Sequence, residues 1–66
     1  MSTEILKNKF NVVIGKTVDT GTRINVYDSS NALLGYYSKS NDRTYDASNN
    51  YKGQGNLLAI FLADKY

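Results

Sequence analysis

The sequence predicts an all-β fold built from repeated β-hairpins, and two observations carry this prediction. A nine-residue unit that begins at Tyr27 recurs at Tyr45, an offset of 18 residues, with Tyr, Asp, Ser, Asn and Gly at matching positions. Each copy contains an Asp-x-x-Asn turn signal that is typical of a hairpin loop. The chain has 66 residues, which is enough for one domain, residues 1–66.

The turn in each unit has the composition of a three-residue hairpin loop followed by a bulge. Asp28 can open a type I turn, because its carboxylate can accept a hydrogen bond from the backbone two residues on. Asn31 then stands where a left-handed backbone is needed, which Asn adopts more readily than other non-glycine residues. Asp46 and Asn49 repeat the pattern. A fainter copy begins at Asn8, and the sequence alone leaves open whether it is a third unit.

These turns imply a strand pairing. For the first hairpin the expected pairs are Tyr27–Leu33, Val26–Leu34 and Ile24–Tyr36. For the second hairpin they are Tyr45–Tyr51 and Thr44–Lys52. Because side chains alternate between the two faces of a strand, the tyrosine-containing pair next to each loop should lie on equivalent faces. Gly35 and Gly53 are expected to be structural, serving a bulge or the close approach of a side chain such as Tyr27 or Tyr45.

The segment before the repeats contains two expected elements. Residues 3–9 could form a short helix with Ser2 or Thr3 as its cap. Residues 10–16 are expected to form a strand, because Val12, Val13 and Ile14 are β-branched.

The C-terminal segment, residues 56–66, is ambiguous between strand and helix. Its leucines and alanines favour a helix capped by Asn56, whereas Ile60 and Phe61 suit a strand. A strand ahead of a short terminal helix is slightly favoured. Residues 57–63 are apolar on every side, so this segment should be central in either conformation.

The small size of the chain indicates self-association. A domain of this length buries only ~60% of the surface of its unfolded chain and usually needs further support. The sequence contains no Cys and no His, so it offers no disulfide and no thiolate or imidazole metal site. We therefore expect no metal and no cofactor, and we expect a homo-oligomer, most simply a tetramer. Closed symmetry would also cover exposed strand edges.

The sequence has no pattern of a secretory leader, and its longest apolar run is seven residues, Leu57 to Ala63. A membrane-spanning helix needs ~20 apolar residues. The expected location is therefore cytoplasmic, without a membrane partner.

The hairpin units resemble the small proteins described as the four-fold β-flower, over about residues 23–62. The matching positions are Tyr27, Asp28, Gly35, Tyr45, Asp46, Gly53, Gly55 and Asn56. The chain departs from that pattern where Asn31 and Asn49 replace an expected turn glycine. The resemblance implies hairpin repeats that form a shallow symmetric barrel, here completed by oligomerisation. It implies no reaction, since this family has no general activity to carry over.

The sequence predicts a binding protein rather than an enzyme. The turn aspartates are explained by capping, and Gly53-Gln54-Gly55 is too short to match a phosphate-binding loop. The candidate ligand-binding residues are basic or aromatic: Arg23, Tyr36, Tyr37 and Arg43. Arginine can hold a phosphate or carboxylate bidentately, and a tyrosine ring can stack on another ring. Tyr36 and Tyr37 should point to opposite faces, and Tyr37 is expected to share the face of Arg23.

Three function classes remain open from the sequence. One is a non-catalytic homo-oligomer that holds a small anionic ligand, such as a nucleotide, in pockets between subunits. The second is a protein-interaction or inhibitory module with a tyrosine-rich face. The third, single-stranded nucleic-acid binding, is least favoured, because aspartates interrupt any basic groove: Asp28, Asp42, Asp46 and Asp64.

Overall fold

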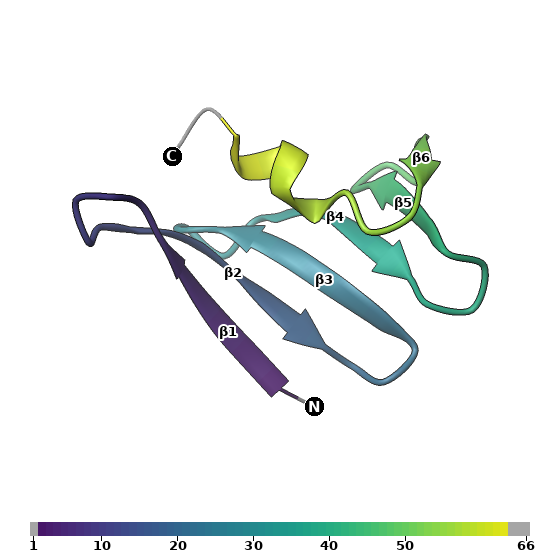
Figure 1. The fold of residues 1–66 in the computed structure, drawn as a ribbon, viewed down its shortest axis with the longest axis horizontal. Coiled ribbons are helices and arrows are strands. Elements are labelled where there is room, and N and C mark those ends of the chain that lie inside the picture. Colours follow the sequence, from purple (N-terminus) through teal and green to yellow (C-terminus); the bar gives the residue numbers. More distant parts are fainter. Residues whose placement is uncertain (1, 64–66) are drawn as a thin grey trace.

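The computed structural model describes residues 2–63, which form an open antiparallel sheet of six strands and a short C-terminal 3-10 helix (Figure 1). Each strand pairs with the next in chain order: β1 (Ser2–Lys7), β2 (Val13–Asp19), β3 (Arg23–Asp28), β4 (Leu33–Ser38), β5 (Arg43–Asp46) and β6 (Tyr51–Gln54). The helix η1 (Leu58–Leu62) packs on β3 and β4. The expected all-β class is confirmed, and the architecture is an open meander.

Three of the hairpin loops have one geometry, which makes the faint upstream copy a true third unit. The side chain that opens each loop accepts hydrogen bonds of 2.8–3.1 Å from the backbone N–H groups two and four residues on. These residues are Asn8, Asp28 and Asp46. The fourth residue of each loop has a φ of 63–67°, in the left-handed region, and it is asparagine in every case: Asn11, Asn31 and Asn49.

A bulge follows each of these loops and changes the expected pairing. The register shifts in the β1–β2, β3–β4 and β5–β6 pairs, and the bulged residues are Ile14, Leu34 and Lys52. The pairs beside the loops, Tyr27–Leu33 and Tyr45–Tyr51, are confirmed. Beyond the bulge the expected pairs are wrong by one residue, because the expected pairing left out the extra residue. The observed pairs are Val26–Gly35, Ile24–Tyr37 and Thr44–Gly53.

Glycine recurs immediately after each bulge, on the sheet face that η1 covers: Gly15, Gly35 and Gly53. A Cβ on Gly35 would lie 2.5 Å from Phe61 Cζ, and one on Gly53 would lie 2.5 Å from Leu57 Cδ1. A Cβ on Gly15 would lie 3.1 Å from Leu62 Cδ1. The prediction of a close approach is confirmed, but the approaching side chains come from the C-terminal segment rather than from Tyr27 or Tyr45.

The core lies between this face and the C-terminal segment. Its buried apolar residues are Ile14, Val26, Leu58 and Leu62. Thr44 is also fully buried, and its hydroxyl joins the two layers. Thr44 Oγ1 donates to the carbonyl of Gly55 at 2.7 Å and accepts from the N–H of Leu57 at 3.0 Å. The sheet therefore fixes the start of the C-terminal segment by a polar contact and its end by apolar packing.

Three expectations about the flanking segments need correction. Residues 3–9 do not form a helix, because β1 pairs along its length with β2 and the Asn8 loop follows it. The second strand begins at Val13 instead of residue 10, since the preceding residues form that loop. The C-terminal segment is a 3-10 helix without a preceding strand, and Asn56 Oδ1 accepts a hydrogen bond from the N–H of Leu58 at 3.2 Å. The expectations for residues 64–66 lie outside the described residues.

Candidate aromatic and basic face

We call the sheet face that η1 covers the inner face and the opposite one the outer face. Ile24 and Val26 of β3 pack toward the core, so alternation places Arg23, Asn25 and Tyr27 on the outer face. Directly paired residues share a face, which extends the outer face across all six strands.

Three tyrosine rings from adjacent strands form the centre of the outer face. Tyr36 of β4 stacks on Tyr45 of β5, with ring centroids 5.3 Å apart and ring planes at 26°. Tyr51 of β6 lies against Tyr45 at 6.1 Å with its plane tilted by 60°. The guanidinium of Arg23 lies 4.4 Å from the centroid of Tyr36, and that of Arg43 lies 5.6 Å from the centroid of Tyr51. We call these five side chains the outer row.

Hydrogen bonds from two loops hold the rings of the outer row. The hydroxyl of Tyr36 donates to Oδ1 of Asn49 at 2.6 Å. The hydroxyl of Tyr45 accepts from Nδ2 of Asn41 at 3.1 Å. Asn49 is the left-handed residue of the β5–β6 loop, so the same residue both shapes the loop and positions a ring.

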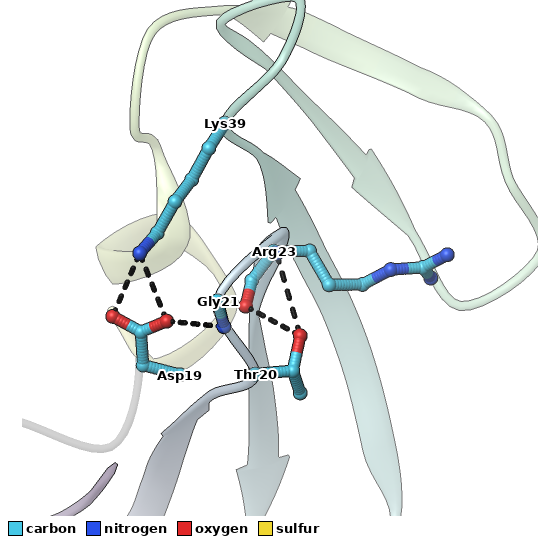
Figure 2. A network of polar contacts seen from close by, with 5 residues as sticks. All are labelled: Asp19, Thr20, Gly21, Arg23 and Lys39. Atoms are coloured by element: carbon cyan, nitrogen blue, oxygen red, sulfur yellow. Dashed lines mark hydrogen bonds and ion pairs between the residues drawn. The ribbon is translucent and has the colours of Figure 1, made fainter. Parts of the chain in front are cut away.

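The Arg23 side chain extends away from the carboxylate of Asp19 (Figure 2). That carboxylate is bonded to Lys39 Nζ at 2.8 and 2.9 Å and to the N–H of Gly21 at 2.9 Å. The backbone of Arg23 is held by Thr20, whose hydroxyl donates to the Arg23 carbonyl at 3.1 Å. Within residues 2–63, the guanidinium groups of Arg23 and Arg43 form no ion pair with a carboxylate.

The structure brings three of the four predicted site residues together and separates the fourth. Arg23, Tyr36 and Arg43 share the outer face. Tyr37 does not share the face of Arg23, because the bulge at Leu34 shifts the register by one residue. Tyr37 instead packs against the core on the inner face. It donates a hydrogen bond to Asp42 at 2.6 Å, which raises the pKa of its hydroxyl above the ordinary value of 10.0.

The remaining carboxylates of the strands and loops are also engaged or turned away from the outer face. The hydrogen bond from Lys39 holds the pKa of Asp19 below its ordinary value of 3.8. The backbone N–H of Asn50 likewise lowers the pKa of Asp46. Asp28 accepts two backbone hydrogen bonds inside its own loop. Glu4 lies on the inner face, where it lines a pocket of about 240 Å³ together with residues of β1, β2, β3 and the C-terminal segment.

Sequence reasoning missed four contributors to the outer face. Tyr45 and Tyr51 complete the outer row, and Lys16 of β2 lies 5.4 Å from the centroid of Tyr27 on β3. The signal for the three tyrosines was present in the repeat, because the tyrosines beside the two loops were already expected on equivalent faces, whereas the repeat carries no signal for Lys16. If the expected pairing had included a bulged residue directly before each repeat glycine, Tyr36 would also have been predicted on the face of these tyrosines.

The described part of the chain contains no cluster of three or more carboxylate, His or Cys side chains that could bind a metal ion. None of its helices is long and apolar enough to cross a membrane. Compared with protein-family models, with curated proteins and with solved structures, the chain matches none. The fold and the site together define a small antiparallel meander with one basic, aromatic face.

Proposed function

We propose that the protein is a non-catalytic, homo-oligomeric module that binds an anionic, ring-bearing ligand of the nucleotide class on its outer face. One observation carries the proposal. Two arginines stack on tyrosine rings of the same row, and neither pairs with a carboxylate of residues 2–63.

Stacking prepares an arginine to bind a phosphate. The guanidinium carbon of Arg23 lies over the ring of Tyr36, 4.4 Å from its centroid, and the N–H groups radiate in the plane of the guanidinium. Those edges bind phosphate or carboxylate oxygens through charge-assisted, often bidentate, hydrogen bonds. Because the side chain is already held by the ring, binding loses less rotamer entropy than it would with a free arginine.

Self-association would enclose such a ligand. The sheet is open at β1 and β6, and several large apolar side chains are exposed, including Ile5 at 53% and Phe10 at 73%. Pairing of edges between copies would close the meander toward the shallow symmetric barrel that the β-flower resemblance implies. A pocket for a small ligand would then form between the outer faces of neighbouring copies.

The oligomer is tested by light scattering at micromolar concentration. The expected mass is that of a tetramer of 7.4 kDa chains. A mass of one chain would contradict the oligomeric part of the proposal and leave the outer row to act on a single subunit.

The ligand site is tested by replacing Arg23 with alanine and titrating ATP as the nucleotide probe. We expect the affinity to fall roughly ten- to a hundredfold, the loss of one charge-assisted pair worth about 1.5–3 kcal/mol. The melting temperature should stay unchanged, because an exposed charge contributes little to stability. Lys39→Ala is the matched control, since it also removes one cation, but from the Asp19 pair outside the outer row. Equal losses in both variants would indicate a nonspecific charge effect and overturn the site.

A further inference from the structure

The two arginines of the outer row are too far apart for one phosphate group. They contact the terminal rings, Tyr36 on β4 and Tyr51 on β6, with Tyr45 on β5 between them. Strands β4 and β6 are separated by two inter-strand intervals, about 10 Å. A ligand that engages both arginines must therefore carry at least two anionic groups that are separated by a comparable distance.

Alternation of cation and ring continues beyond the outer row. On the neighbouring strands, Lys16 lies over Tyr27 at 5.4 Å, and the side chains of both share the outer face. From β2 to β6 the outer face therefore presents three cation–ring pairs in succession. A single-stranded nucleic acid has the complementary pattern, because phosphates and unpaired bases alternate along its chain.

The objection to nucleic-acid binding that the sequence raised does not apply to the outer face. Asp28 and Asp46 bind backbone N–H groups of their own loops, and Asp42 accepts from the inner-face residue Tyr37. Glu4 and Asp19 project from the inner face, where Asp19 pairs with Lys39. Asp64 lies outside the described residues. The strands thus place Lys16, Arg23 and Arg43 on the outer face with no described strand carboxylate beside them.

We infer that the ligand of the outer face is a single-stranded nucleic acid that crosses the strands from β2 to β6. Its phosphates contact Lys16, Arg23 and Arg43, and its bases pack against the rings of Tyr27 and Tyr51. The path covers four inter-strand intervals, about 19 Å measured across the strands. It also shifts along the strands, because Lys16 pairs with Tyr27, four residues from Arg23 on β3. The path accommodates on the order of four nucleotides, the lower end of the site sizes found for single-strand-binding sheets. This inference rests on the proposed function, since it names the ligand class of the same face.

Fluorescence anisotropy with labelled oligothymidylates and oligouridylates of increasing length tests the inference. Affinity should rise up to about four nucleotides and then level off. The logarithm of the binding constant should fall with the logarithm of salt concentration with a slope of about −2, as three phosphate contacts predict for a single strand. A duplex of the same length should bind more weakly, because its bases are not free to pack on the rings.

One variant, Lys16→Ala, separates this inference from the proposed function, and Arg23→Ala and Lys39→Ala are its controls. Lys16→Ala should reduce the salt slope by about 0.7 and weaken the oligonucleotide several-fold, while ATP binding at Arg23 stays unchanged. Arg23→Ala should weaken both ligands, and Lys39→Ala should weaken neither. Oligonucleotides that bind no more tightly than ATP, with ATP still dependent on Arg23, would overturn the inference and leave the proposed function standing. Absence of binding to either ligand would overturn both.

Discussion

Replacing Gly35 with valine is expected to lower the melting temperature of the domain by roughly 10–20 °C. A Cβ at this position would lie 2.5 Å from Phe61 Cζ and 2.6 Å from the carbonyl oxygen of Tyr45. The ring can rotate, but the carbonyl belongs to β5 and moves only if β4 and β5 separate. Overpacking of this kind costs about 3 kcal/mol, and a domain of this size loses ~4–8 °C per kcal/mol.

Thermal denaturation followed by circular dichroism measures this effect, with Ser38→Val as the matched control. Ser38 lies on the same strand, but on the outer face, where an added branched side chain meets no covering segment of residues 2–63. In a Phe61→Ala background, Gly35→Val should still lower the melting temperature, because the Tyr45 carbonyl remains in the way. A Gly35→Val melting temperature equal to that of the control would show that the close approach is not a constraint.

The repeat could be predicted from the sequence because its signals are local. The side chain at the start of each loop accepts hydrogen bonds from backbone N–H groups no more than four residues away. Asp28 and Asp46 are therefore sufficient to predict their loops from local sequence. Asn8 accepts the equivalent hydrogen bonds with a neutral amide. Phe10 is an unusual residue for the middle of a turn, yet it is 73% exposed in this loop and imposes no conflict.

The first strand could not be predicted from local preference. Residues 3–9 contain no strong β signal, and their strand conformation comes from pairing with β2. A firm assignment of the Asn8 loop would have implied it, because a hairpin loop requires a strand on each side. The prediction of a helix over residues 3–9 was therefore wrong, because the evidence for a strand there lies in the Asn8 loop and not in the segment itself.

The C-terminal segment was misjudged for a different reason. A strand points successive side chains to opposite faces, whereas this segment must direct Leu57, Phe61 and Leu62 to one face of the sheet. A short helical turn does so, and the three side chains reach the glycines of three different repeats. The glycines recur in the sequence with the period of the hairpins, but nothing in their spacing identifies the segment that fills the space above them.

The site was predicted in part, because charged and aromatic residues can be recognised in the sequence. The sheet face on which each side chain lies depends on the strand register, which the sequence did not give correctly. One bulged residue, Leu34, exchanged Tyr36 and Tyr37 between the two faces. The faces of Arg23 and Arg43 were unaffected, because β3 and β5 contain no bulged residue. Both arginines pair with the same residue, Ser38.

Leu62→Ala is expected to destabilise the domain by about 2–5 kcal/mol, the usual cost of truncating a buried leucine. The Leu62 side chain is fully buried and packs in the cluster with Ile14, Val26 and Leu58. These four residues are the whole set of buried apolar side chains in residues 2–63, and they form one cluster. A loss of this size approaches the whole stability of a marginal domain.

Ile60→Ala provides the control, because Ile60 lies in the same helical turn but is 51% exposed. Amide hydrogen exchange distinguishes the two variants more sharply than melting alone. Leu62→Ala should reduce protection throughout β2, β3 and β4, since the core spans those strands, whereas Ile60→Ala should leave it unchanged. If both variants lost protection only in η1, the C-terminal segment would be an accessory layer on a sheet that is stable without it, and the three repeat glycines would need another explanation.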